Sequence, residues 1–402
     1  MHIALFHQYH HNPDCPATCR HYTFMEELVK RHQVTLITSD AWESKRLTRD
    51  YPWVPDGVEL VSVHVPYHNR MGKVRRLQAF GSFAMHALTK GLKIPKPDVI
   101  WGVSTPLTTA WAASKVAGLR KVPWVFEVQD LWPSFPIEMG AVPSKFLQNQ
   151  LYRLEKSLYR SADHIIPLSK GMEEYILSQN ISPEMVTTFV NGTEVDLGRV
   201  TQIQQDELRK DLVLEGKQVV LYAGTYGRAN DMPLLVETAR RLQHRTDIVF
   251  VFTGQGFDEP LLEKASQELP NMLLLPPLPR HKVFTLFALA EVSVVSFIDL
   301  PVLQANSPGK LFDSLATGTP VIVTNPGWTK ELVERHQCGW YVPAGDSAQL
   351  AQTLENTLHD KAALQRMNVN ARKVAETQFD RLQMVPALES IFERVVATRK
   401  SR

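Results

Sequence analysis

NSPGKLFDSLATGTPVIVT, residues 306–324, runs from a small-residue loop into a short amphipathic helix, a Gly-x-Pro turn and an apolar strand. The loop presents backbone N–H groups at a helix N-terminus, where the helix dipole favours anions. Pro308 stands where a missing N–H costs little, and Lys310 adds a positive charge. Asp313 follows three residues later on the same helix face. A diphosphate at the loop and sugar hydroxyls at the carboxylate fit this layout; an ordinary capped helix in an α/β domain is the alternative.

Short apolar strands and amphipathic helices alternate through the first half of the chain. Ile3–Phe6 and Val34–Thr38 are expected strands, and His21–Lys30 between them has the apolar spacing of a helix. The alternation continues to His164–Leu168. This repeated order predicts an α/β fold, with a mostly parallel sheet that helices cover on both faces. Ligands bind such sheets beyond the carboxyl ends of the strands.

The alternation starts again near residue 190. We expect Thr188–Thr193 to form a strand that runs into an Asn-Gly turn, and a second α/β series to follow from Gln218 to Arg335. Only helices are expected from Ala348 to Lys400. A chain of 402 residues is also too long for one typical core. The sequence therefore predicts two doubly wound domains, residues 1–190 and 191–375, and a C-terminal helix within residues 376–402 that packs back on the first domain.

The composition narrows the function classes. The formal net charge is +2, which argues against a dedicated nucleic-acid binder. Apolar runs stay far below the ~18 residues of a transmembrane helix, and the N-terminus lacks a charged n-region and a small-residue cleavage site, so we expect a cytoplasmic protein. The cysteines Cys15, Cys19 and Cys338 suit a reducing compartment. Free thiols are favoured over zinc, because no second paired cluster follows the Cys-x-x-x-Cys.

With these segments in place, the chain resembles the retaining glycosyltransferases of the GT-B fold, family four, over nearly its whole length. Within that family it is most similar to bacterial enzymes that build O-antigen, capsule and exopolysaccharide units, including the N-acetylfucosamine transferase type. Asp-Leu-Trp-Pro at 130–133, Lys-Leu-Phe-Asp at 310–313 and Gly-x-Pro-Val-Ile at 318–322 are specific in combination, although each alone is weak. The other matching segments are His7–Tyr9, Arg20–Tyr22 with Glu27–Leu28 and His32–Thr38, Glu127–Gln129 directly before Asp-Leu-Trp-Pro, and Val190–Gly192.

The chain departs from the family pattern at the donor segment. The broad family has two glutamates with seven residues between them; here Ala305 stands at the first position and Asp313 at the second. The usual Arg and Lys after the first strand of the C-terminal domain are also missing, with Tyr226 and Asp231 near their places. Arg228 is the candidate that would supply this charge instead. These departures concern the diphosphate contacts and leave the expected fold unchanged.

The resemblance implies a retaining hexosyltransferase that moves a sugar from a nucleotide donor, expected to be a UDP-sugar, to a saccharide or polyprenyl-linked saccharide acceptor in surface polysaccharide assembly. In this reaction negative charge builds on the leaving diphosphate, so catalysis needs electrostatic stabilisation there. As the resemblance implies, GT-B enzymes provide it with backbone amides and Arg or Lys side chains. No metal and no cofactor is therefore expected, and the sequence has no Asp-x-Asp motif.

The expected site residues have three roles. Lys310 and Arg228 would stabilise the diphosphate, and Gly224 would let the backbone approach a phosphate. Asp130 follows a buried strand, where it would position the acceptor or handle a proton; a capping aspartate is the alternative. The catalytic candidates are Asp130, Lys310 and Arg228; the donor-binding candidates are Gly224, Thr225, Ser307, Gly309, Lys310, Leu311 and Asp313; the acceptor-binding candidates are His7, Arg20 and Trp132.

Residues 70–88 combine basic and apolar side chains in one expected helix. The basic residues are Arg70, Lys73, Arg75 and Arg76, and the apolar ones are Leu77, Phe80, Phe83, Met85 and Leu88. Such a helix can dock on anionic lipid, which would suit the polyprenyl-linked acceptor that the resemblance implies. A cationic surface helix with an ordinary core face is the alternative. Peripheral contact with the inner face of the cell membrane is thus a hypothesis beside a cytoplasmic location.

Two other function classes stay open on the sequence alone. A nucleotide-sugar epimerase or hydrolase of the same fold would act without an acceptor, and a phosphorylase would need inorganic phosphate or a Lys-bound pyridoxal cofactor, for which the chain has no dedicated lysine motif. A non-catalytic nucleotide-sugar-binding protein is the other class, because Ala305 replaces the first family glutamate. The products formed from a panel of nucleotide sugars would separate these classes.

Overall fold

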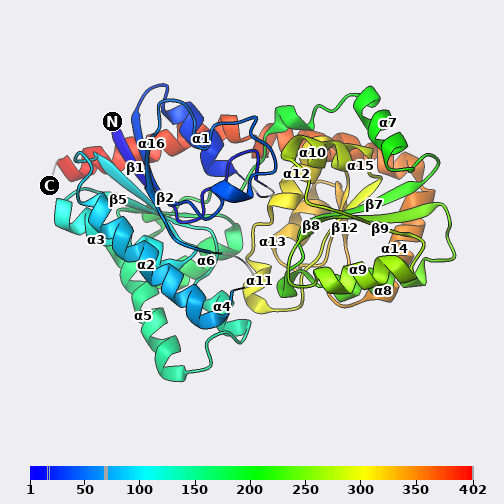
Figure 1. The fold of residues 1–402 in the computed structure, drawn as a ribbon, viewed down its shortest axis with the longest axis horizontal. Coiled ribbons are helices and arrows are strands. Elements are labelled where there is room, and N and C mark those ends of the chain that lie inside the picture. Colours follow the sequence, from blue (N-terminus) through cyan, green and yellow to red (C-terminus); the bar gives the residue numbers. More distant parts are fainter. Residues whose placement is uncertain (16, 18, 68–70, 401–402) are drawn as a thin grey trace. The chain divides into compact units, whose positions relative to one another are not determined.

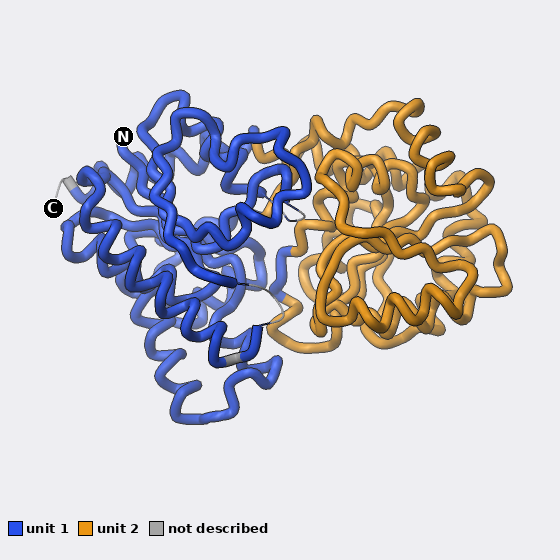
Figure 2. The backbone as a smooth tube through the Cα atoms, in the orientation of Figure 1, with its two compact units in different colours: residues 1–190, 305–307, 382–402 blue, residues 191–304, 308–381 orange. Residues whose placement is uncertain are grey.

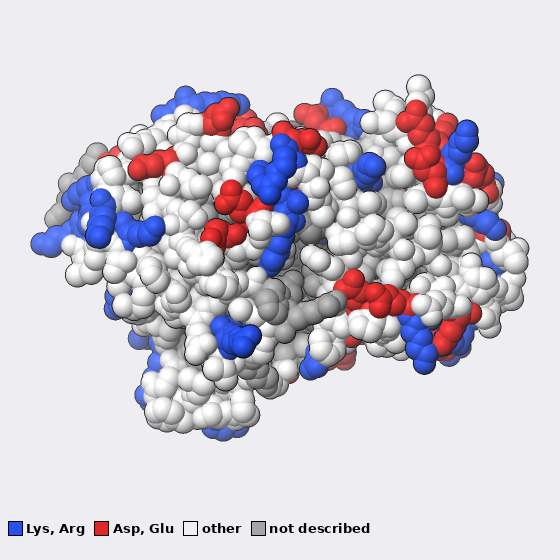
Figure 3. Space-filling view, in the orientation of Figure 1, with Lys and Arg blue, Asp and Glu red and all other residues white. Residues whose placement is uncertain are grey.

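The computed structural model describes residues 1–15, 17, 19–67 and 71–400, which form two compact units (Figures 1 and 2). Unit 1 contains residues 1–190, 305–307 and 382–402, and unit 2 contains residues 191–304 and 308–381. Basic and acidic side chains are interspersed on the surface in Figure 3, as expected for a nearly balanced net charge. None of the described helices is long and apolar enough to span a bilayer.

Unit 1 is built on a six-stranded parallel sheet in the order β3-β2-β1-β4-β5-β6. The order reverses between β1 and β4, which both pair with parallel neighbours along their length. All five residues of β1 are buried, as is typical of a strand covered on both faces. The strands are β1 (His2–Phe6), β2 (Gln33–Ser39), β3 (Glu59–Val63), β4 (Val99–Val103), β5 (Trp124–Val128) and β6 (His164–Pro167).

Helices cover both faces of this sheet (Figure 1). One core joins the strands to α1 and α16, and α2, α3 and α5 lie on the opposite side. The C-terminal helix α16 belongs to this unit: Phe392 lies 5.4 Å from Trp101 between ring centroids. The helices are α1 (Arg20–Leu28), α2 (Lys73–Gly91), α3 (Leu107–Arg120), α4 (Ser134–Glu138), α5 (Lys145–Ser161), α6 (Lys170–Ser178) and α16 (Arg381–Lys400).

Unit 2 repeats this design with a six-stranded parallel sheet in the order β12-β11-β10-β7-β8-β9. Here the order reverses between β7 and β10, so the parallel-sheet rule places a ligand beyond the carboxyl ends of these two strands. The strands are β7 (Gln218–Thr225), β8 (Ile248–Gln255), β9 (Met272–Leu275), β10 (Val292–Val295), β11 (Val321–Val323) and β12 (Gly339–Tyr341).

Two hydrophobic cores flank the second sheet. One contains α8, α9 and α14, and the other contains α10 with α7 packed against it. Figure 1 shows these two sets of helices on opposite sides of the strands. The helices are α7 (Gln202–Asp211), α8 (Met232–Arg241), α9 (Glu259–Glu268), α10 (Arg280–Leu289), α11 (Pro301–Gln304), α12 (Gly309–Thr317), α13 (Trp328–Arg335), α14 (Ser347–His359) and α15 (Lys361–Val374).

The structure differs from the sequence expectations at both crossings between the units. Thr188–Thr193 is not a strand, because Gly192 adopts φ 60 and ends the extended conformation after two backbone hydrogen bonds to β6. At the second crossing, a π-helical turn over Ala375–Phe379 continues α15, and Asp380 is extended before α16 begins. The helix expected within residues 376–402 therefore starts at Arg381, and residues 376–381, which include its first residue, belong to unit 2.

Candidate active site

The N-terminus of α12 and the carboxyl end of β7 form the centre of the candidate donor site in unit 2. Pro308 is the N-cap residue of α12, and Gly318 ends the helix in the left-handed conformation, with φ 78. Leu311, Phe312 and the other apolar residues of α12 face the core, which fixes the helix against the sheet. The first N–H groups of a helix have no partner within it, so this end of α12 favours an anion.

Lys310 reaches from α12 to the last residues of β7. Its Nζ donates a hydrogen bond of 2.5 Å to Tyr222 Oη and lies 3.9 Å from the centroid of the same ring. The side chain runs along Gly224, where a Cβ would come within 3.0 Å of Lys310 Cε. Gly224 has φ +141, a conformation that L side chains rarely adopt. A glycine is therefore required where the lysine passes the strand.

Lys310 has no carboxylate partner in the part of the chain that the structure describes. Burial lowers the pKa of its ammonium group to about 7, and no charge of opposite sign offsets this effect. The neutral hydroxyl of Tyr222 is its hydrogen-bond acceptor, and this hydroxyl in turn donates to Thr225 O at 2.8 Å. The site thus contains a partly buried cation beside a helix N-terminus, an arrangement suited to an anionic ligand.

The other donor candidates occupy varied positions. Arg228 is exposed after β7, and its guanidinium lies 3.9 Å from the ring centroid of Phe257. Thr225 is exposed at the end of β7, and Gly309 is the first residue of α12. Leu311 is fully buried and its N–H donates to Pro308 O at 3.1 Å, so it contributes packing and no available ligand contact. Ser307 is buried and belongs to unit 1.

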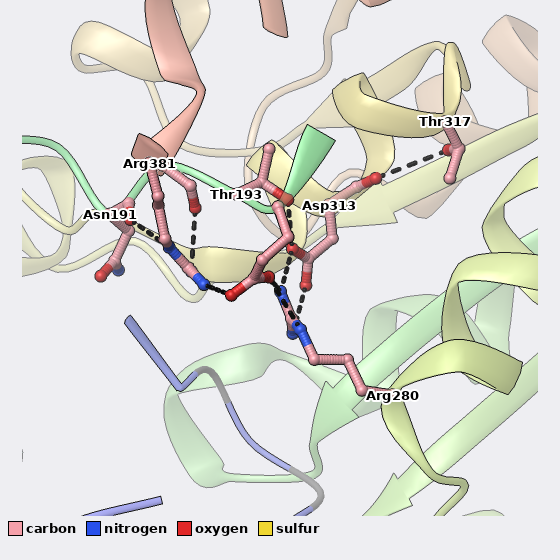
Figure 4. Close-up of polar contacts among 8 residues, drawn as sticks. Asn191, Thr193, Arg280, Asp313, Thr317 and Arg381 are labelled. Carbon is pink, nitrogen blue, oxygen red and sulfur yellow. Dashed lines mark hydrogen bonds and ion pairs between the residues drawn. The ribbon is translucent and has the colours of Figure 1, made fainter. Parts of the chain in front are cut away.

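Asp313 lies in a buried ion-pair network (Figure 4). Its Oδ1 accepts hydrogen bonds from Thr193 Oγ1 at 2.9 Å and Arg280 Nη2 at 3.0 Å, and its Oδ2 accepts from Arg280 Nη1 at 3.3 Å. Arg280 Nε also donates to Glu194 at 2.9 Å. Asp313 is thus not the surface carboxylate of an ordinary helix. Its predicted contact with ribose hydroxyls stays a prediction, and most of its acceptor positions are already used.

The same network includes the two segments where the chain passes between the units, residues 191–194 and Arg381. Arg381 is fully buried; its Nε donates to Asn191 O and its Nη2 to Gly192 O, both at 3.0 Å. Arg381 also pairs with Glu194, and its N–H donates to Thr193 O at 3.1 Å. Figure 4 shows Arg381 and Asn191 beside the Asp313–Arg280 pair. Two chain segments about 190 residues apart are therefore held by one buried charge cluster.

The acceptor candidates of unit 1 surround a different buried charge. Glu127, at the end of β5, accepts from His21 Nε2 at 3.1 Å and from Trp101 Nε1 at 3.0 Å, and Arg20 Nε lies 3.8 Å away. Burial alone would raise the pKa of Glu127, but Arg20 and His21 outweigh it and hold the pKa at about 2. The ring of His7 lies 4.3 Å from that of His21 between centroids. His7 and Arg20 are thus brought together around Glu127.

Asp130 and Trp132 follow β5 at the same end of the sheet. Asp130 Oδ2 accepts from Thr105 Oγ1 at 3.2 Å, and burial raises the pKa of the carboxyl group. Trp132 is half-buried and meets Phe80 edge-on at 5.9 Å between centroids. Its Nε1 atom is buried without a hydrogen-bond partner among the described residues. Both positions are compatible with the predicted acceptor roles, which stay predictions.

Sequence reasoning missed the partners of these residues. Tyr222 stands in an apolar strand and has the pattern of a core residue, although a buried tyrosine hydroxyl usually needs a partner. His21 and Glu127 were seen only as parts of matching segments. Within the described ranges, no group of three or more His, Cys, Asp and Glu side chains is arranged to hold a metal ion.

Comparisons with known proteins agree with this two-unit architecture. The sequence model of a glycosyl transferase 4-like domain matches residues 21–192, and that of glycosyl transferases group 1 matches residues 204–374. The chain is 25% identical over 318 residues to an Escherichia coli (strain K12) protein named as the colanic acid biosynthesis glycosyl transferase WcaI, covering 77% of each chain.

Solved structures share the fold. Sucrose-phosphate synthase from Thermosynechococcus elongatus matches with a TM-score of 0.75 and 17% identity over 99% of both chains. Anabaena HepE in complex with UDP-glucose matches with a TM-score of 0.70 and 17% identity over 100% of both chains. The strand order reverses in both sheets, and the two domain models match the chain one after the other. The chain therefore belongs to the GT-B glycosyltransferases of family four.

Proposed function

We propose that this glycosyltransferase is a retaining, metal-independent hexosyltransferase that moves a sugar from a UDP-sugar to a saccharide or lipid-linked saccharide acceptor in surface polysaccharide assembly. The observation that carries the proposal is Lys310, a cation with no carboxylate partner among the described residues, beside Gly224 and the N-terminus of α12. The neighbour HepE was solved with UDP-glucose, and the relative WcaI is named for colanic acid biosynthesis. These names support the donor and acceptor classes.

The chemistry proposed for Lys310 is stabilisation of the leaving group. The bond between the sugar C1 and the diphosphate oxygen breaks, and a bond forms from C1 to an acceptor hydroxyl oxygen. The electron pair stays with the diphosphate, and the acceptor proton passes to it. Lys310 and the first N–H groups of α12 would stabilise this charge as it develops. Arg228 would add a second positive charge, and Asp130 would orient the acceptor hydroxyl.

Product analysis tests the proposal. The protein is incubated with a panel of UDP-sugars and a short-chain polyprenyl diphosphate saccharide, and the products are identified by mass spectrometry and by the NMR coupling of the new anomeric proton. We expect one donor to give a lengthened acceptor with its anomeric configuration retained, with EDTA present or absent. No product from any pair would overturn the proposal. An epimer or free sugar formed without acceptor would favour the epimerase or hydrolase class.

Peripheral membrane contact is a further part of the proposal, supported by one face of α2. Val74 and Leu77 are 69% and 65% exposed, and Met85 is also exposed, although Phe80 and Phe83 are buried core residues. Arg75 is exposed next to this apolar row. Arg70 lies outside the described residues, as does the side chain of Lys73. An exposed apolar row with adjacent cations is the arrangement that anionic lipid surfaces bind.

Vesicle co-sedimentation tests this contact. We expect binding to vesicles of phosphatidylglycerol and phosphatidylcholine that is weaker with phosphatidylcholine alone and at high salt. The double variant Val74→Ser, Leu77→Ser should lose most of this binding, whereas Leu119→Ser, an equally exposed leucine on α3, should retain it. Equal binding by the double variant and the wild type would contradict a role for α2.

A further inference from the structure

The ammonium group of Lys310 has an unusual partner for a partly buried lysine. Buried lysines are normally paired with a carboxylate, because an isolated charge is costly away from water. Here the partner is the Tyr222 hydroxyl at 2.5 Å, and the structure shows no ion pair for Lys310 among the residues it describes. A hydroxyl leaves the positive charge un-neutralised, so the charge stays available to a ligand.

Tyr222 is itself rigidly placed. It is 2% exposed within the core of unit 2, and its ring lies 6.0 Å from that of Tyr226 and 6.2 Å from that of Phe252 between centroids. Its hydroxyl donates to Thr225 O at 2.8 Å. Because that single proton is used by Thr225, the oxygen can only accept from Lys310, and it therefore favours the protonated lysine.

From this geometry we infer that Tyr222 is a positioning residue: its hydroxyl orients Lys310 toward the end of β7 and keeps it able to bind a diphosphate, so that diphosphate binding is coupled to uptake of a proton by Lys310. This inference rests on the proposed function, because it takes the diphosphate of the nucleotide donor as the ligand. Tyr222 acts through Lys310 and needs no contact with the donor itself.

Few charged or titratable groups act on Lys310 and Tyr222 among the residues that the structure describes. The surrounding titratable and charged groups are Tyr226 and Asp258, which act on Tyr222, Arg228, which acts on Asp258, and Asp313 on the same helix as Lys310. Asp313 is neutralised by Arg280, and the pKa of Tyr222 is raised by burial, so its hydroxyl stays protonated. Burial lowers the pKa of Lys310 to about 7. A diphosphate would raise it again, because it places negative charge beside the ammonium group.

Calorimetry with UDP measures this coupling. UDP is titrated into the protein between pH 6 and 9, in two buffers of different ionisation enthalpy, which gives the number of protons taken up on binding. Lys310→Met supplies the baseline for the ionisation of UDP itself. Above this baseline we expect almost no uptake at pH 6 and close to one proton at pH 8. Lys310→Arg should bind UDP with no excess uptake at any pH, because arginine stays protonated.

The Tyr222→Phe variant then tests the positioning role. Phenylalanine keeps the ring in the core but removes the acceptor of Lys310, so the lysine loses its proton at lower pH. We expect UDP affinity at pH 8 to fall about tenfold and the rise in proton uptake to begin at lower pH than in the wild type. Tyr226→Phe is the matched control: its hydroxyl has no hydrogen-bond partner in the described structure, and the uptake profile should be unchanged.

The outcomes separate this inference from the proposed function. If the folded wild type gives no heat with UDP at any pH, the proposed function fails. If it binds UDP but Tyr222→Phe has the wild-type proton-uptake profile, the positioning role fails and the proposed function stands. If Tyr222→Phe shows no cooperative unfolding, the hydroxyl is structural and the positioning role is likewise overturned.

Discussion

Unit 1 holds a buried charge and unit 2 a partly buried one, each at the carboxyl end of a parallel sheet, but among the described residues only the charge in unit 1 has partners of opposite sign. In unit 1, Glu127 is surrounded by His21, Trp101 and Arg20, so its negative charge is fully compensated. In unit 2, Lys310 has a neutral hydroxyl as its partner. The first arrangement stabilises the folded unit, whereas the second leaves a positive charge without a counter-charge at the proposed donor site.

We therefore expect Glu127 to contribute mainly to the stability of unit 1, and Lys310 to contribute mainly to the proposed donor binding. Removing a compensated buried charge leaves its partners unpaired and costs stability. Removing an uncompensated one costs function and can leave stability unchanged or higher. Both effects can be measured on the same protein.

The largest effect is expected for Glu127→Gln. This change leaves Arg20 and His21 buried beside a neutral amide, so the free energy of unfolding should fall by about 3–5 kcal/mol. Urea denaturation with linear extrapolation measures it. Glu27→Gln, which breaks the surface pair with Lys30, should cost less than about 1 kcal/mol. Equal small effects of both variants would show that Glu127 is not the centre of a compensated cluster.

The same residue predicts a pH dependence. The pKa of Glu127 is depressed to about 2 in the folded state, so its contribution is present above the unfolded pKa of about 4.3 and is lost as pH falls toward 2. The wild type should therefore lose stability across this window, and the loss should be smaller in Glu127→Gln. Parallel stability–pH curves would contradict the assignment.

Lys310→Met should show the opposite pattern. Without the ammonium group, the rate of sugar transfer should fall by about 10²–10³-fold, or about 3–4 kcal/mol in the barrier. The free energy of unfolding should stay the same or rise, because a partly buried charge without a counter-charge is removed. Steady-state transfer assays and urea denaturation measure the two quantities. Lys330→Met removes another lysine that lies over a tyrosine ring in unit 2, and should retain full activity.

An intermediate effect is expected for Asp313→Asn, which tests whether this carboxylate serves the network or the ribose. If it serves the network, the free energy of unfolding should fall by about 2 kcal/mol, because Arg280 loses one of its two carboxylates. UDP and pyrophosphate should then lose affinity equally. A loss for UDP alone, with unchanged stability, would support the predicted ribose contact instead.

The smallest effect is expected for Tyr226→Phe. The Tyr226 hydroxyl oxygen is buried without a hydrogen-bond partner among the described residues, so its removal should raise the free energy of unfolding by up to about 1 kcal/mol. Urea denaturation checks the sign. A loss of stability would show that the hydroxyl has a partner in solution, such as an ordered water molecule.

The fold was largely predictable because its strands are short apolar runs with helices between them. Ile3–Phe6 and Val34–Thr38 fall within observed strands, and the loop before Gly309 correctly marks the start of α12. The failure at Thr188–Thr193 has a local cause: apolar and β-branched residues there favour a strand, but the left-handed Gly192 turns the chain away. Residue propensities predict an extended conformation, but they do not predict at which residue the segment stops pairing with a sheet.

The candidate site was predictable only in part. Lys310 and Gly224 could be proposed from a helix N-terminus and a strand end, since both signals are local. The hydrogen-bond partners of the site residues could not be proposed in this way, because Tyr222 is 88 residues from Lys310 and Glu194 is 86 residues from Arg280. Such pairs form through the order of the strands, which a single sequence does not specify. Burial of Leu311 and Asp313 likewise depends on how α12 is rotated against the sheet.

The position of α16 has a consequence for how the chain acquires its structure. Val385, Leu388 and Ile391 share one core with Ile3 and Leu5, although about 380 residues lie between them. During synthesis the strands of unit 1 emerge first, yet part of their apolar surface stays uncovered until residues 385–396 have been made. Unit 2 needs nothing beyond Arg381, so it can complete its core earlier. The half of the protein that is translated first is thus the half that matures last.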